Sequence, residues 1–165
     1  MIWHLSNRAD PSAVMIADRH YNRQKFGTPQ FVPPGSCVVL MAVGAVWVTS
    51  WPLAEYVKHA WAGAWVNSIF RKEIDGSASE MIRQAIAATR WYYGEPPSLG
   101  MITFIDPNKV RPIKRRGIRM WGYSYMRAGF RPVGSTKGGL LAFQLLPVDM
   151  PDPIAPIGAQ LELAL

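Results

Sequence analysis

The stretch from residue 60 to residue 106 constrains the fold most, because it predicts a strand, a helix and a second strand in direct succession. The sequence AWAGAWVNSIFRKE contains a long apolar strand, and LGMITFID is a shorter one. Between them, Ser77-Ala78-Ser79-Glu80 forms a capping box that precedes apolar residues at helical spacing, and Gly94 ends the helix. Such a unit makes a right-handed crossover, which places its two strands parallel in one sheet.

Strands are predicted on both sides of this unit, so the fold class is α+β rather than a doubly wound parallel sheet. Asp10 and Pro11 indicate the start of a first helix that extends to about Gln24. We expect one domain (1–147) with a mixed, partly parallel central sheet flanked by helices, and a Pro-rich tail (148–165) along its surface or on a neighbour. The other expected elements are a strand at Trp3–Leu5, a hairpin of SCVVLMA and AVWVTSW, a short helix in GYSYMRAG, a closing hairpin in FRPVGSTKGGLLAFQLLP, and a short helix or strand in AQLELAL.

Composition excludes several classes of protein. The single cysteine, Cys37, allows neither an intramolecular disulfide nor a cysteine zinc cluster, and no ligand spacing predicts a metal site. The longest apolar run, Val38 to Val48, is too short to span a bilayer, and the first ten residues do not resemble a signal peptide. We therefore expect a cytoplasmic protein with no membrane partner. The net charge of +7 and a pI of about 9.9 favour an acidic partner such as nucleic acid.

The basic charge is concentrated in one segment. Six cations fall within eleven positions with no acidic residue between them. A loop of this kind binds phosphates and positions a nucleic acid, and the following Trp121 and Tyr123 are suited to stacking on a base. The alternative interpretation is a solvated loop. The six residues are Lys109, Arg111, Lys114, Arg115, Arg116 and Arg119.

The predicted helix that follows the long strand begins at a candidate phosphate site. A helix N-terminus presents free N–H groups and the positive end of its dipole, which suits a pyrophosphate. Serine hydroxyls and the cation Arg71 would add to this site. The alternative is that the serines only cap the helix. The residues assigned here to cofactor binding are Arg71, Ser77, Ala78, Ser79 and Glu80.

Four residues are candidates for catalysis. Tyr125, in YMRAGF, is a candidate general acid, or else a half-buried tyrosine. His20, next to Tyr21 near the end of the first predicted helix, is a candidate base, or else a histidine that interacts with the helix dipole. Asp106 ends an apolar strand, where ligands bind in open sheets, but it also precedes Pro107 and fits an Asx turn.

YMRAGF resembles the tyrosine-to-Gly-Phe signature near the end of the GCN5-related N-acetyltransferase (GNAT) fold, and the order of strand, helix and strand agrees with that family. The resemblance implies that the helix N-terminus holds the pyrophosphate of acetyl-CoA. It also implies that Tyr125 protonates the departing thiolate. The usual Arg/Gln-x-x-Gly-x-Gly/Ala loop of the family is replaced here by Asp75 to Glu80, which favours a divergent branch.

The branch that this chain resembles is the Mom-like group of phage DNA-modification proteins. The resemblance covers residues 17–146 and rests on His20-Tyr21, FRKE with the serine pair and Glu80, TFIDPNKV, and YMRAGF leading to GSTKGGLLAF. It implies an enzyme in the host cytoplasm that adds a carbamoylmethyl-type group to adenine N6 in DNA and so blocks restriction. Acetyl-CoA or a related acyl donor would be the cofactor. By similarity the site is lined by His20, Tyr21, Arg71, Ser77, Ser79, Asp106 and Tyr125.

Two other functions stay open on the sequence alone. One is an acetyl-CoA-dependent N-acetyltransferase that acts on a small molecule or a protein. The other is a non-enzymatic DNA-binding protein on the same fold. The Pro-rich tail and the tryptophans are also compatible with a homodimer.

Overall fold

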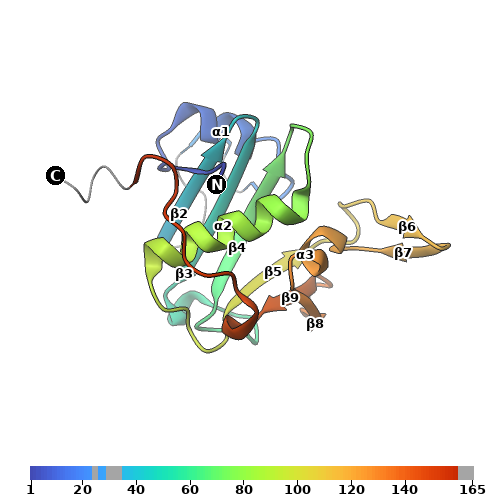
Figure 1. Cartoon of the computed structure of the whole chain (residues 1–165). Coiled ribbons are helices and arrows are strands. Elements are labelled where there is room, and N and C mark those ends of the chain that lie inside the picture. The colour runs from blue at the N-terminus through green and yellow to red at the C-terminus, as the bar shows by residue number, and fades with distance from the viewer. Residues whose placement is uncertain (24–25, 29–34, 160–165) are drawn as a thin grey trace.

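The computed structural model describes residues 1–23, 26–28 and 35–159, and its centre is a seven-stranded sheet (Figure 1). The strand order is β1-β2-β3-β4-β5-β9-β8, and within it only β4 and β5 run parallel. The α+β prediction is confirmed, with a sheet that is mostly antiparallel. The strands are β1 (His4–Leu5), β2 (Gly35–Ala42), β3 (Ala45–Pro52), β4 (Trp65–Lys72), β5 (Met101–Ile105), β8 (Arg131–Ser135) and β9 (Leu141–Leu145).

The parallel pair separates partway along its length. β4 and β5 are paired from Trp65 opposite Met101 to Asn67 opposite Thr103, although β4 continues to Lys72. On its other side, β4 pairs with β3 through an irregularity that leaves Ser68 without a partner in the register. Such a bulge bends the strand and increases its twist. The two parallel strands therefore leave a gap between their C-terminal halves.

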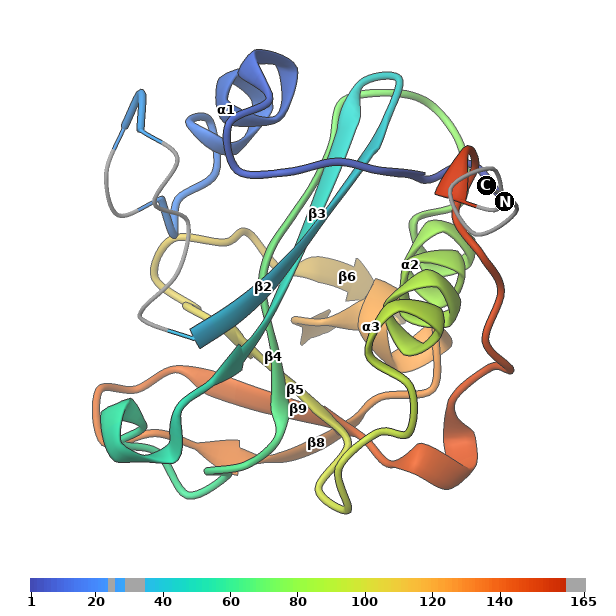
Figure 2. The same cartoon turned by 90° about the vertical axis from the view of Figure 1, so that its left-hand side faces the viewer.

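Helices cover both faces of the sheet, as Figure 2 shows. α2 (Ala78–Tyr93) packs on one face over a core that includes the fully buried Trp3, Trp47 and Trp65. α1 (Pro11–Ala17) packs on the opposite face over Val39, Val46, Val48 and Ile69. A short helix α3 (Tyr123–Arg127) is held beside α2, because Arg83 Nη1 donates to Ala128 O over 2.7 Å. Two 3₁₀ turns complete the set, η1 (Ala54–Tyr56) and η2 (Pro147–Asp149).

The first helix is shorter than the sequence predicts. Asp10 caps its start as expected, but the helix ends at Ala17 rather than near Gln24, which lies outside the described residues. The Asp18 carboxylate accepts from Arg23 Nε over 2.7 Å and from Gly27 N over 3.0 Å, and these contacts turn the chain.

The basic segment is a hairpin rather than the loop that the sequence predicts. β6 (Ile113–Arg115) pairs with β7 (Ile118–Met120), and the hairpin projects from the body of the protein in Figure 1. At its root, Trp121 Nε1 donates to Val110 O over 2.9 Å. Charged residues interrupt the alternation of apolar and polar residues that usually indicates a strand, so the sequence predicts these two strands only weakly.

The described part of the Pro-rich tail lies along its own domain. It runs beside α2, where Ile154 N donates to Ala87 O over 3.1 Å, and it reaches β1, where Ile157 N donates to Trp3 O over 2.8 Å (Figure 1). Met150 is buried in the core. The predicted element in AQLELAL lies outside the described residues after Ala159. Among the described helices, none combines the length and apolar character needed to cross a bilayer.

Candidate active site between the diverging strands

Two adjoining cavities lie at the gap between β4 and β5. Their volumes are about 150 Å³ and about 220 Å³. They share four lining residues, Tyr21, Asn67, Ser68 and Phe104. His20 and Tyr125 line the smaller cavity, and Asp106 lines the larger one. The structure thus brings together all four residues that the sequence nominates for catalysis.

Asn67 forms the polar floor of the smaller cavity. Its side chain is 3% exposed, and Nδ2 donates to Val48 O over 3.0 Å and to Ile69 O over 3.1 Å. Because only the amide nitrogen can donate to two carbonyls, Oδ1 must face the opposite direction. There Oδ1 accepts from Tyr125 Oη over 2.6 Å and from Thr103 Oγ1 over 3.2 Å. The orientation of the amide is therefore determined by its four contacts.

Tyr125 reaches this floor from α3, where Phe70 and Phe130 pack against its ring. Burial raises the pKa of the Tyr125 phenol well above its usual value, so the hydroxyl keeps its proton at neutral pH. That proton points at Asn67 Oδ1. The hydroxyl oxygen could therefore accept a hydrogen bond from a molecule bound in the cavity that Tyr125 lines.

The turn after α1 bridges the two diverging strands. Tyr21 Oη donates to Phe104 O over 3.3 Å and accepts from Asp106 N over 3.4 Å, both on the β5 side. Asn22 Nδ2 donates to Ser68 O on β4 over 2.9 Å. The Tyr21 and Asn22 side chains therefore bind backbone groups of β4 and β5 beyond the point where the two strands stop pairing with each other. Burial raises the pKa of the Tyr21 phenol, so it too stays protonated at neutral pH.

His20 packs against Tyr21, with ring centroids 4.6 Å apart. Burial and, to a smaller extent, the positive charge of Arg71 lower the pKa of His20 to about 4. The imidazole is therefore neutral at pH 7. Its Nδ1 accepts from Asn22 N over 3.0 Å, which leaves the proton on Nε2. In this tautomer His20 offers an N–H donor to the cavity rather than a basic nitrogen.

Asp106 forms a turn and also lines a cavity. Its Oδ1 accepts from Asn108 N over 2.9 Å, which is the Asx turn that the sequence allows. The same residue lines the larger cavity with Lys109 and Tyr21. The Asx turn holds the carboxylate at the end of β5, on the side where the strands have separated.

Ser68 carries a buried polar atom without a partner. Its hydroxyl oxygen makes no hydrogen bond to any described residue, and Ser68 lines both cavities. A buried hydroxyl without a partner is uncommon in folded proteins and is often explained by a missing ligand or water. The bulge in β4 is therefore a place where a bound molecule would find a hydrogen-bonding group.

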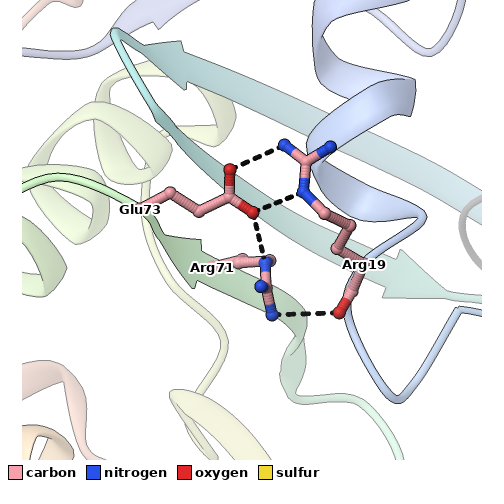
Figure 3. A network of polar contacts seen from close by, with 3 residues as sticks. All are labelled: Arg19, Arg71 and Glu73. Carbon is pink, nitrogen blue, oxygen red and sulfur yellow. Dashed lines mark hydrogen bonds and ion pairs between the residues drawn. The ribbon is translucent and has the colours of Figure 1, made fainter.

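Arg71 takes part in a surface network at the end of β4, which Figure 3 shows. Its Nε donates to Glu73 Oε1 over 2.7 Å, and its Nη1 donates to Arg19 O over 2.9 Å. Arg19 binds both oxygens of Glu73, over 2.5 and 2.6 Å. The guanidinium groups of Arg19 and Arg71 lower the pKa of Glu73 to about 2. Arg71 is accordingly held by protein partners near His20, and it lines neither of the two cavities.

The start of α2 has one of the two contacts of the predicted capping box. Ser77 Oγ accepts from Glu80 N over 3.3 Å and lies 3.0 Å from Ser79 Oγ. The Glu80 carboxylate accepts from Gln84 Nε2 over 3.4 Å, rather than from the backbone of Ser77. Ala78 is the first helical residue. These four residues are absent from the lining of the two cavities, so the helix N-terminus would form a separate part of the site.

The basic hairpin adjoins the cavities at its root. Val110 lines the smaller cavity and Lys109 the larger one. Nine of the 18 basic residues and none of the 11 acidic residues lie between Pro107 and Val148. The rest of the chain therefore carries a small negative charge. Arg111, Lys114, Arg115, Arg116 and Arg119 are all exposed along this segment.

The two aromatic residues after the hairpin have internal partners. Trp121 bonds to Val110 O, and Tyr123 lies under the Arg115 guanidinium, 4.6 Å from Cζ to the ring centroid. Arg127 Nη1 donates to Tyr123 Oη over 3.2 Å. Trp121 therefore closes the root of the hairpin and Tyr123 attaches it to α3, while stacking of these rings on a base stays a prediction.

Sequence reasoning missed Asn67, Thr103, Ser68 and Asn22. Asn67 and Ser68 in WVNSIF and Thr103 in MITFI are the polar residues of two otherwise apolar strand segments, and this was the available signal. A polar residue in a buried strand needs a partner, and the partner is often part of a site. For Asn22 no comparable signal exists, because its partner is a strand carbonyl far away in the sequence.

Comparisons of the chain with protein-family models, with curated proteins and with solved structures found no match. In the described part of the chain, no three His, Cys, Asp or Glu side chains lie close enough together to share a metal ion. The function is therefore inferred from the geometry of the site.

Proposed function

We propose that this chain is a DNA-modification enzyme of the Mom-like type on a GNAT-like fold, which transfers an acyl-type group to adenine N6 in DNA and so protects it from restriction. One observation carries the proposal. A cavity between two diverging parallel strands ends at the Tyr125–Asn67 pair and is bordered by the root of a strongly basic hairpin. A site for chemistry and a surface for phosphates thus adjoin each other.

The fold supports this assignment. β4, α2 and β5 form one crossover, and the strands on either side of the gap are the ones that it makes parallel. The capped N-terminus of α2 follows β4 directly and suits the phosphates of an acyl donor such as acetyl-CoA. Ser77 and Ser79 add exposed or half-exposed hydroxyl groups to that helix end.

The proposed chemistry uses the cavity residues in distinct roles. The adenine N6 amine donates one N–H to Tyr125 Oη, whose own proton is directed at Asn67. The nitrogen attacks the acyl carbon of the donor, an N–C bond forms, and the bond to the leaving group breaks. Asp106 accepts the second amine proton, because its carboxylate lines the adjoining cavity. His20 is the weaker candidate for the base, since its Nδ1 already accepts a hydrogen bond.

Tyr125 has a further role in this scheme only if its hydroxyl rotates. Protonation of a departing thiolate by Tyr125 requires the 2.6 Å bond to Asn67 to break first. The raised pKa keeps the proton available for such a step. We therefore assign Tyr125 first to holding the amine and only second to protonating the leaving group.

The DNA must release its base for this reaction. The N6 amine of adenine is poorly accessible within a duplex, so enzymes that act on a base take it out of the stack. The smaller cavity, with Phe70 and Phe104 in its wall, has a volume of about 150 Å³, and a protein cavity of this size is known to hold a flat aromatic ring. Cations of the hairpin would hold the flanking phosphates.

Mass spectrometry of digested DNA tests the proposal. DNA from cells that express the wild-type chain should contain a new nucleoside whose mass identifies the added group. Cells that express Tyr125→Phe should contain much less of it. Unmodified DNA in cells that also supply phage partners and donors would refute the proposed function.

The α2 N-terminus also favours a second candidate, an acetyl-CoA-dependent N-acetyltransferase for a small molecule or protein. Thermal stabilisation by acetyl-CoA but not by DNA would support this candidate. Salt-dependent DNA binding without any altered nucleoside would instead support a non-enzymatic DNA-binding protein.

A further inference from the structure

We propose that the β6–β7 hairpin enters the major groove of double-stranded DNA, with Arg116 at its tip against the base edges and Lys114 and Arg119 on the flanking phosphates. This inference rests on the proposed DNA substrate.

Two like charges face each other across the hairpin. Lys114 is the cross-strand partner of Arg119, so their side chains share one face. Arg115 is on the other face, where its guanidinium lies over Tyr123. Like charges directly opposite each other destabilise a strand pair. Because no acidic residue occurs between Pro107 and Val148, an external anion is the natural partner of this pair.

The tip of the hairpin is strained at a cation. Arg116 has a φ of 52° and the following Gly117 a φ of 78°, which corresponds to the two-residue turn that joins tight hairpins. Asn, Asp and Gly favour the first position of that turn, and other residues adopt positive φ at a cost. Among the described residues, Arg116 is the only non-glycine with a positive φ. An unfavourable residue at the most projecting point indicates a function for its guanidinium.

The dimensions of the hairpin select the groove. Three-residue strands extend about 10 Å, which matches a major groove about 8.5 Å deep. A two-stranded ribbon fits the major groove, about 12 Å wide, whereas the minor groove, about 6 Å wide, admits a ribbon only where the DNA is strongly bent or widened. The major groove of double-stranded RNA is too narrow for side chains to read. B-form DNA is therefore the partner that this shape accepts.

Contacts at its root and on one face hold the hairpin in place for binding to DNA. Trp121 closes its root on Val110, next to the smaller cavity. Arg115 of β6 lies over the ring of Tyr123, 4.6 Å from Cζ to the centroid, which attaches one face of the hairpin to α3. The face that bears Lys114 and Arg119 stays free for the DNA.

Fluorescence anisotropy with a labelled DNA duplex, the same single strand and a matching RNA duplex tests this inference without any acyl donor. Arg116→Asn should weaken binding to duplex DNA about tenfold and leave its salt dependence unchanged, as expected for a base-edge contact. Lys114→Gln should reduce the slope of log K against log salt by about 0.9. Lys58→Gln, which removes the same charge after η1, is the matched control and should bind normally.

Thermal unfolding separates binding from folding. Asn tolerates positive φ better than Arg does, so Arg116→Asn should be at least as stable as wild type while binding more weakly. Groove insertion is wrong if Arg116→Asn binds duplex DNA normally, or if it weakens single-strand and RNA binding by the same factor. It is also wrong if the wild-type chain does not bind duplex DNA at low salt. Absence of a modified nucleoside would overturn the proposed function alone.

Discussion

The hydroxyl of Tyr125 donates a 2.6 Å hydrogen bond to Asn67 Oδ1, which joins a short helix after the basic hairpin to the centre of β4. Because Asn67 Nδ2 is held by Val48 O and Ile69 O, the amide cannot turn away from Tyr125 without losing both contacts. The pair therefore determines the hydrogen-bonding character of the cavity. A ligand meets an acceptor at Tyr125, and this property is open to direct measurement.

Removing the Tyr125 hydroxyl should affect activity far more than stability. Tyr125→Phe deletes one hydrogen bond, but Asn67 Oδ1 keeps its bond from Thr103, so the free energy of unfolding should fall by only about 1 kcal/mol. Modification of DNA should fall at least tenfold, because the target amine loses its acceptor. Urea unfolding and nucleoside mass spectrometry measure the two effects.

Asn67→Leu is the comparison for this variant. It removes the donor to two strand carbonyls as well as the acceptor for Tyr125, so unfolding should become easier by about 3 kcal/mol, roughly 1 kcal/mol for each of these bonds. Equal destabilisation by both variants would contradict the view that the Asn67 amide is held by four contacts.

Acid should destabilise the protein through His20. The pKa of His20 is lowered to about 4, against about 6.5 for an unperturbed histidine, so between these pH values the unfolded chain binds a proton that the folded chain does not. Stability should therefore fall as the pH is lowered from 6.5 to 4. The same titration in His20→Gln should be flatter over this range, with urea midpoints as the readout.

The pKa of His20 can also be measured directly. NMR of the imidazole C–H signals should show one histidine, assigned with His20→Gln, that stays neutral until about pH 4. Arg71→Gln should raise the pKa of His20, because the positive charge of Arg71 is one cause of the shift. A normal pKa for His20 in the wild-type protein would mean that the ring is more hydrated than the structure indicates.

Ser68→Ala should affect activity without lowering the free energy of unfolding. The Ser68 hydroxyl is buried and has no partner among the described residues, so its removal should leave the free energy of unfolding unchanged or raise it by about 1 kcal/mol. Activity should nevertheless decrease if a bound molecule uses that hydroxyl. Loss of stability above 1 kcal/mol in urea would indicate that Ser68 already has a structural partner.

Gly122→Ala should disrupt the placement of α3. Gly122 has a φ of 70° at the start of that helix, and an added Cβ would lie 2.6 Å from Phe143 Cζ. Gly63→Ala is the control, since Gly63 also has a positive φ, of 101°, but open space around its Cβ position. Gly122→Ala should be less stable than the control by about 1–3 kcal/mol in urea, because of overpacking. Equal stability would show that Phe143 moves freely.

Much of the fold was predictable because its signals are local. The Ser77 cap, the start of α1 at Pro11 and the closing hairpin each depend on a few neighbouring residues. The end of α1 was predicted wrongly, because Asp18 uses Arg23 and Gly27 to turn the chain where helical spacing alone continues. The β6–β7 hairpin was missed because charges hide its alternation.

By itself, the sequence determined the order of strands and helices apart from β6 and β7, the nomination of Tyr125, Asp106, His20 and Tyr21, and the position of the basic segment. Only the tertiary structure decided what these residues contact. Tyr125 meets Asn67 across 58 positions, and Tyr21 meets Phe104 across 83. Such contacts exist because β4 and β5 separate near the bulge in β4. Side chains from distant parts of the chain then form hydrogen bonds with the backbone groups that the strands leave unpaired. Local propensity carries no information on that packing, since it arises only when the whole sheet has assembled.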